Sequence, residues 1–151
     1  MKFRISETCG TPHAVFDDEP PPRSWLLGMY LDDMRGQEDL YLGEIAKAEA
    51  GETITDLYNN IVDVQLYPDG RVTIEELRYN AQDEIDRGPP ERTEITLAQA
   101  KQLILDWLEA KKKWFAQKAQ AAPGGDKRAA SEPTEVVEPT QPGPGVSKPR
   151  E

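Results

Sequence analysis

A β-hairpin signal in the middle of the chain is the feature that most constrains the fold. Residues 62–66 alternate apolar and polar side chains, and the alternation resumes at Val72 and Ile74 after a turn that contains Pro68 and Gly70. Proline presets the first central position of a type I turn, and glycine accepts the positive φ that completes a three-residue loop. The sequence therefore predicts two antiparallel strands joined by a tight turn.

Other segments give weaker signals for strands. Residues 2–8 alternate as a half-buried strand, residues 25–31 are more apolar and indicate a central strand that ends at Asp32, and residues 91–95 fit a short strand beside the hairpin. The second hairpin strand either bulges at residues 75–76 or ends there, because Leu77 breaks its alternation. Residues 10–22 are expected to form a loop, and residues 52–59 fit either one helical turn or a packed loop.

Two segments carry helical periodicity. Residues 38–50 place Leu42, Ile45 and Ala46 at helical spacing, with a glycine stop at residue 51. A longer helix is expected to begin at Thr96, because Gln99 three residues later completes a capping box, and to end near residue 119. Its predicted apolar face is broad enough to pack on a sheet, and comprises Leu97, Ala100, Leu103, Ile104, Trp107, Leu108, Lys111 and Phe115.

These elements predict an α+β fold, with an antiparallel sheet of about five strands and two helices on one face. Residues 1–119 are expected to form a single domain. Residues 120–151 are expected to be a disordered tail, because the 29 residues from 123 onward contain six prolines, four glycines and no aromatic side chain. Ordering such a segment costs about 1–2 kcal/mol per residue in backbone entropy.

The charge of the chain restricts its partners. Residues 1–94 carry 21 acidic and 9 basic side chains, whereas residues 95–119 carry 2 acidic and 5 basic ones. Binding to nucleic acid relies on Lys and Arg that neutralise phosphates, so the acidic body excludes nucleic acid as the main partner and favours a basic protein. The alternative is that the acidity serves solubility alone.

The sequence also bears on the compartment. Cys9 is the only cysteine, which rules out an intramolecular disulfide and favours a reducing compartment. The first residues contain no apolar run of signal-peptide length, and no stretch reaches the roughly 18 apolar residues that span a bilayer. We expect a cytoplasmic protein that does not bind membranes.

Catalytic and metal-binding motifs are weak. Cys9 and His13 are four residues apart and would be half of a zinc site, but the chain has no other His or Cys to complete it. His13 is also the only conventional general base, and nothing in the sequence orients it beside a nucleophile. We therefore expect no enzymatic activity, no metal and no cofactor.

Close pairs of carboxylates are frequent and have two interpretations. In a chain this acidic, chance pairs on a solvated surface are expected. The alternative is a binding face for a cationic partner, because several pairs fall at predicted strand ends and on one polar segment, residues 78–90. The candidate partner-binding residues are Asp32, Asp33, Glu75, Glu76, Asp83, Glu84 and Asp86.

The basic end of the long helix is the counterpart of this acidic body. Lysines at 111–113 and 118 flank Trp114 and Phe115. Such a mixture is used at anionic membranes and on nucleic acids. A basic helix end with apolar anchors is the simpler interpretation, because lysines favour the negative end of the helix dipole.

The order of these segments is similar to that of small acidic bacterial immunity proteins of contact-dependent inhibition and polymorphic toxin systems, and it also resembles the YacL-like family. The resemblance lies in residues 1–8, 30–33, 60–77 and 94–97, and in a final helix that carries Trp107. It does not extend to the proline-rich loop or to the tail. It implies an α+β protein that neutralises a toxin, often a nuclease with a basic groove.

Two functions follow as hypotheses. The first is a non-enzymatic acidic binding protein, in the form of an immunity protein against a basic toxin. The second is a cellular accessory or adaptor protein that binds a partner through its final helix and tail.

Overall fold

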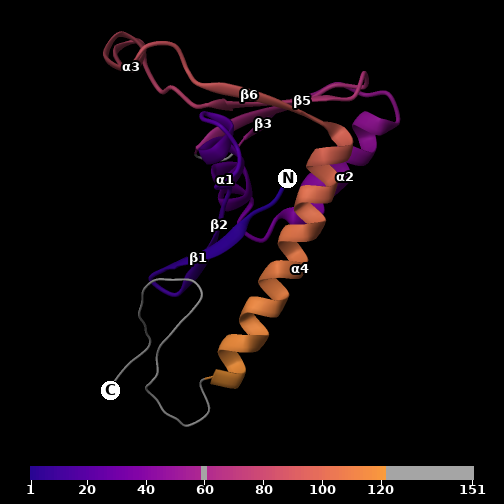
Figure 1. The fold of residues 1–151 in the computed structure, drawn as a ribbon. Helices are drawn as coiled ribbons and strands as arrows, with labels where there is room; N and C mark the ends of the chain where they lie inside the picture. The colour runs from indigo at the N-terminus through magenta and orange to yellow at the C-terminus, as the bar shows by residue number, and fades with distance from the viewer. Residues whose placement is uncertain (59–60, 122–151) are drawn as a thin grey trace.

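The computed structural model describes residues 1–58 and 61–121, and its ribbon is shown in Figure 1. Helices and strands are mixed along the chain, which confirms the α+β class. The elements are β1 (Arg4–Thr8), β2 (Thr11–Val15), α1 (Arg23–Met34), α2 (Glu38–Glu49), β3 (Ile54–Tyr58), β4 (Val62–Leu66), β5 (Arg71–Glu76), α3 (Ala81–Arg87), β6 (Arg92–Thr96) and α4 (Leu97–Ala121). Residues 122–151 of the predicted tail lie outside the described residues.

The described strands form two antiparallel sheets. One has four strands in the order β3-β4-β5-β6, and the other is the hairpin of β1 and β2. The predicted antiparallel pairing is confirmed, but its strands are divided between two sheets. Helices α1 and α4 each contact both the four-stranded sheet and β2, so these helices lie between the sheet and the β1–β2 hairpin (Figure 1).

The central hairpin forms as predicted. Leu66 pairs with Val72, and the amide of Tyr67 donates to the carbonyl of Arg71 over 2.9 Å across a three-residue loop. Gly70 has a φ of 102°, which closes the loop where a side chain would be strained. Strand β5 pairs in continuous register to Glu76 and ends there, so of the two alternatives at residues 75–76 the strand end is correct.

The core lies under one face of the four-stranded sheet. Alternate residues of β4 and β5 point into it, where α1, α2 and α4 cover them, and the opposite face is polar. Helices on one face were therefore predicted correctly. Fully buried large side chains include Phe16, Leu26, Leu27, Tyr30, Leu31, Met34, Ile45, Leu66, Ile74, Leu103 and Ile104.

The predicted strand at residues 25–31 is wrong, because this segment lies within helix α1. A short apolar run fits a buried strand and a buried helix equally well, and flanking residues must decide. Here Leu26, Tyr30 and Met34 recur at intervals of four and are all buried, which is helical periodicity. Asp32 therefore lies inside the last turn of a helix and not at a strand end.

Two strands were missed by the sequence analysis. The expected loop at residues 10–22 contains β2, which pairs with β1 through a two-residue turn at Cys9 and Gly10, both with positive φ. This turn has the left-handed geometry that suits tight hairpins. Residues 54–58 form β3, so neither a helical turn nor a packed loop is correct there. Its pairing with β4 shifts register between Ile54 and Leu57, which hides the alternation in the sequence.

Helix α4 begins as predicted. The amide of Gln99 donates to Thr96 Oγ1 over 3.0 Å, and the amide of Thr96 donates to Gln99 Oε1 over 2.9 Å. The helix buries its first half through Trp107 and then continues past the core, ending at Ala121. Phe115 is consequently 55% exposed and does not belong to the packing face predicted for it.

Among the helices of residues 1–58 and 61–121, none is both long enough and apolar enough to cross a membrane.

Candidate partner-binding surface

A short helical excursion protrudes from the end of the four-stranded sheet. We call residues 77–91, which connect β5 to β6 and contain α3, the α3 projection (Figure 1). Every residue of α3 is at least partly exposed. Its first turn is capped by Asn80, whose Oδ1 accepts a hydrogen bond of 2.9 Å from the amide of Asp83. Its helical form is therefore set locally, without burial of a side chain in the core.

Two arginines hold the projection against the sheet. Glu76, at the end of β5, forms ion pairs with Arg78 at 2.5 Å and with Arg87. Arg78 also donates through Nη2 to the carbonyl oxygens of Gly88 and Pro89, at 3.2 and 3.3 Å. The side chains of Glu76 and Arg78 are only 13% and 9% exposed, so the ion pair between them is shielded from solvent and helps to position α3.

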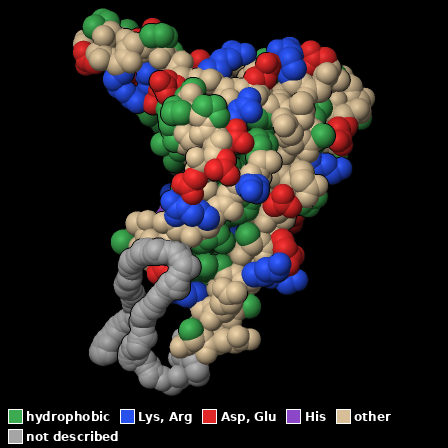
Figure 2. Space-filling model, viewed as in Figure 1, with side chains coloured by type: hydrophobic (Ala, Val, Ile, Leu, Met, Phe, Trp, Pro, Cys, Tyr) green, Lys and Arg blue, Asp and Glu red, His purple; other side chains and the backbone are tan. Residues whose placement is uncertain are grey.

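The outer surface of the projection combines acidic and apolar side chains. Glu84 and Asp86 are exposed, and Asp83 is half-buried. Tyr79 and Ile85 are 71% and 76% exposed, which is unusual for large apolar side chains. In Figure 2 hydrophobic and acidic side chains gather at this tip, with basic ones at its base.

The tip is also slightly hollowed. Ala81, Glu84, Ile85 and Pro89 line a shallow open depression beside α3. An exposed apolar patch rimmed by charge is typical of a protein-interaction site. The tip of the projection is therefore an open surface that is both apolar and acidic, and not an enclosed pocket.

The seven sequence-predicted partner residues do not form one cluster. Asp83, Glu84 and Asp86 lie together on the α3 projection, and Glu76 lies at its base as an anchor. Glu75 points to the polar face of the sheet, opposite Asp63 in the β4–β5 register. Asp32 and Asp33 lie at the end of α1, on a different part of the molecule.

Asp33 has a structural environment that removes it from any exposed face. It is 1% exposed, and its Oδ2 accepts hydrogen bonds from the amides of Ile61 and Val62 at 3.0 and 3.2 Å. This carboxylate ties the end of α1 to the start of β4. Burial, reinforced by the negative charge of Asp33, raises the pKa of the nearby Tyr41.

Asp32 has a partner too. Both of its carboxylate oxygens lie 3.1 Å from Nδ1 of His13, and both side chains are 32% exposed. The contact orients the only histidine of the chain, which the sequence could not anticipate because the two residues are 19 positions apart. Cys9 lies exposed in the hairpin turn. Within the described ranges, no group of three or more His, Cys, Asp or Glu side chains is arranged to hold a metal ion.

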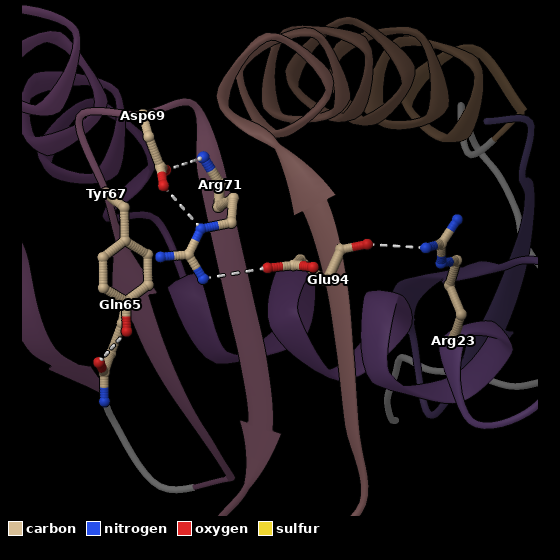
Figure 3. Close-up of polar contacts among 6 residues, drawn as sticks. All are labelled: Arg23, Gln65, Tyr67, Asp69, Arg71 and Glu94. Atoms are coloured by element: carbon tan, nitrogen blue, oxygen red, sulfur yellow. Dashed lines mark hydrogen bonds and ion pairs between the residues drawn. The ribbon is translucent and has the colours of Figure 1, made fainter.

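The polar face of the four-stranded sheet carries a compact charge network (Figure 3). Arg71 lies 4.2 Å over the ring of Tyr67 and forms ion pairs with Asp69 at 2.9 Å and Glu94 at 3.4 Å. The hydrogen bond from Arg71 lowers the pKa of Asp69. Arg23 of α1 reaches strand β6 and donates to the backbone carbonyl of Glu94 over 2.7 Å. Asp69 and Glu94 on this face are thus paired with one arginine, Arg71.

The end of α4 is the second unusual surface. Lys111 pairs with the buried Glu38 of α2 at 2.5 Å, and Lys118 pairs with Glu7 at 3.0 Å. Between them, Lys112 and Lys113 are exposed, Lys112 on the same helix face as the exposed Phe115, and Phe115 contacts Trp114 edge-on. The last turns of this helix therefore carry basic and aromatic side chains outside the core.

Sequence reasoning missed the apolar part of the α3 projection and its arginine anchors. A signal was present, because Ile85 stands alone between Glu84 and Asp86 in a polar segment, a position that no amphipathic pattern would bury. The anchors depend on the pairing of β5 with β6, which brings Arg87 back to Glu76. Comparisons with known proteins give no match to this chain, because no family model, no curated protein and no solved structure is significantly similar to it.

Proposed function

We propose that this protein is a non-enzymatic binding protein that docks its α3 projection against a basic surface of a partner protein. The observation that carries the proposal is a solvent-exposed helix in which Glu84 and Asp86 flank an exposed Ile85. Apolar anchors supply affinity at protein interfaces, and complementary charge supplies association rate and orientation.

The way the helix is held supports this use. Glu76, Arg78 and Arg87 fix α3 through contacts that are independent of its outer surface. A surface held in its binding conformation loses less entropy when it binds. The acidic body adds a long-range field, since residues 1–94 carry 12 more acidic than basic side chains and would attract a basic partner before contact.

The specific form we propose is an immunity-type role in the cytoplasm, in which α3 occupies the basic groove of a nuclease-like toxin. The resemblance of residues 1–8, 60–77 and 94–97 to immunity proteins motivates this form, and the acidic, apolar tip has the chemistry that such a groove would accept. Occlusion requires neither a catalytic group nor a cofactor in this protein. The toxin would be inhibited because its own substrate, a polyanion, competes for the same basic residues.

The test is capture of partners from the source cell by the immobilised full chain, followed by inhibition of any captured nuclease. The variant Glu84→Lys/Asp86→Lys reverses charge on α3. We expect its association rate with the partner to fall at least tenfold, and the difference from the unsubstituted chain to shrink at high salt because salt screens exposed charges.

The matched control is Glu49→Lys/Glu52→Lys, which makes the same change in net charge at exposed positions on and after α2. The control should bind at nearly the unsubstituted rate. Equal losses in the two variants would assign the effect to overall charge and would reject the α3 projection as the binding site. Capture of no basic protein at low salt would reject the partner class.

A second candidate function is an accessory protein that binds through the final helix and tail. The exposure of Phe115 on the same helix face as Lys112 favours it. Here the variant Lys112→Ala/Phe115→Ala should abolish partner capture, whereas the α3 variant should not. The first proposal predicts the reverse pattern.

A further inference from the structure

We propose that the α3 projection of one copy of this chain binds the end of α4 of a second copy, so that copies associate head to tail. The α4 end is defined as residues 112–121, the turns that extend past the core. Each of the two surfaces has an apolar centre and a charged rim, and the rims have opposite sign. The chain therefore supplies both halves of a complementary contact.

Both centres are exposed apolar side chains. On the α4 end, the ring of Phe115 is 55% exposed and projects from a helix whose neighbouring turns are out of the core. On the α3 projection, Ile85 and the depression lined by Ala81, Glu84 and Pro89 form an open apolar receptor. An aromatic ring placed in such a depression is the usual anchor of a small interface.

The charges select the occupant. Residues 112–121 contain three lysines and no acidic residue, whereas α3 places Glu84 and Asp86 on either side of Ile85. Lys118 is paired with Glu7 and Lys113 lies on another face of the helix from Phe115, so Lys112 is the cation available beside Phe115. With Phe115 seated beside Ile85, Lys112, three residues earlier on the same face of α4, is placed to meet an α3 carboxylate, an arrangement that opposes the approach of two identical ends.

The contact must form between copies. Figure 1 places α3 and the end of α4 at opposite ends of the molecule, so the two surfaces cannot meet within one chain. A contact between two different surfaces of identical chains is heterologous, and it continues from copy to copy unless a rotation closes it into a ring. Each surface is centred on a single exposed apolar side chain, Phe115 or Ile85, whereas a stable complex buries roughly 800 Å² per partner, so we expect a weak association.

The inference extends the proposed function, because a basic partner and a second copy would compete for the same α3 surface. Binding of the basic partner would then dissociate the head-to-tail assemblies of this protein. Self-association itself does not depend on the existence of such a partner, so the two proposals fail separately.

The test is sedimentation velocity of the full chain at increasing concentration, in low and in high salt. The tip variant is Glu84→Ala/Ile85→Ala and the end variant is Lys112→Ala/Phe115→Ala. All four replaced side chains are outside the buried core, and alanine favours the helix. The control is Leu40→Ala/Glu49→Ala, which removes an exposed apolar and an exposed acidic side chain from α2.

We expect the unsubstituted chain and the control to show a mass that rises with concentration and falls with salt. Each of the two variants alone should associate at least tenfold more weakly. An equimolar mixture of the two should recover a one-to-one dimer and nothing larger, because one intact surface of each kind remains. That recovery also shows that both variants are folded.

Three results would overturn the inference. The first is an unsubstituted chain that stays monomeric at every concentration in low salt. The second is an association that does not depend on salt. The third is that the tip and end variants associate as strongly as the control. Self-association without capture of any basic protein would instead contradict the proposed function and leave the head-to-tail contact standing.

Discussion

Single residues in this protein decide where helix α1 can lie. Gly28 is inside α1, and a Cβ atom built there would lie 2.9 Å from the carbonyl oxygen of Ala14 on β2. No real Cβ approaches a backbone oxygen so closely, which means that glycine lets α1 pack directly on the β1–β2 hairpin. Asp33 then fixes the other end of the same helix through the amides of Ile61 and Val62.

The variant Gly28→Ala should lower the free energy of unfolding by up to about 2 kcal/mol. Overpacking in a close contact costs about 1–3 kcal/mol, and the gain of about 1 kcal/mol that alanine brings to a helix interior offsets part of that cost. The check is the midpoint of urea unfolding at an unchanged slope.

The matched control is Gly43→Ala in α2, where no atom of the described residues outside its local helix lies within 4 Å of the added Cβ. This variant should be more stable than the unsubstituted chain by about 0.5–1 kcal/mol. Equal shifts for the two glycines would show that α1 and β2 are not in close contact.

At the scale of elements, the position of the α3 projection relative to the sheet depends mainly on one arginine, Arg78. Arg78 bridges Glu76 and the carbonyls of Gly88 and Pro89, so it closes the base of the projection. We expect Arg78→Ala to speed hydrogen exchange at the amides of α3 while the amides of β4 and the buried half of α4 keep their protection. Binding through α3 should weaken as well, because the surface is no longer preorganised.

A suitable comparison is Arg92→Ala, which removes an exposed arginine from the neighbouring strand β6. It should leave exchange in α3 unchanged. Faster exchange throughout the protein in the Arg78 variant would indicate global unfolding and would contradict a local role for this residue.

The sequence predicted elements whose signals are local and missed those whose signals come from distant contacts. The turn at Pro68 and Gly70 and the capping box at Thr96 are complete within a few residues, and both formed as predicted. Helix α1 was predicted as a strand because residues 25–31 are apolar throughout, so no alternation with polar residues shows the helical periodicity. Strand β3 was missed because its register shift against β4 interrupts the alternation.

The candidate site followed the same rule. The acidity of residues 83–86 could be read directly, and their exposure follows from the isolation of Ile85 in a polar segment. Which other carboxylates join them could not be predicted, since strand pairing and helix packing decide it. Asp33 became a buried anchor and Glu76 an ion-pair partner only because β4, β5 and β6 come together around them.

Residues 1–58 and 61–121 form a layer of helices between a four-stranded sheet and a small hairpin, with exposed apolar and charged side chains on the α3 projection and at the end of α4. Its core is apolar but includes two tyrosines from α1 and α2, Tyr30 and Tyr41, whose rings pack edge to face with centroids 6.1 Å apart. Burial raises the pKa of both hydroxyls above the usual 10.0. A neighbouring group raises each pKa further: Tyr41 acts on Tyr30, and Asp33 acts on Tyr41.

These tyrosines predict how the stability of the molecule depends on alkaline pH. A tyrosine with a raised pKa in the folded state contributes its full stability below the unfolded pKa of about 10 and loses it as the pH rises above that value, because only the unfolded chain ionises there. The free energy of unfolding should therefore fall with pH above about 10, with a contribution of up to about 1.4 kcal/mol per pH unit from each tyrosine.

Urea unfolding at a series of alkaline pH values measures this slope. The variant Tyr41→Phe should show a shallower decline than the unsubstituted chain, since one group no longer titrates between the two states. Tyr79→Phe should keep the original slope, because the ring of Tyr79 is 71% exposed. The comparison of slopes, and not of absolute stabilities, isolates the ionisation from any packing that the hydroxyl provides. A decline that is equally steep in the Tyr41→Phe variant would mean that other groups destabilise the protein at alkaline pH.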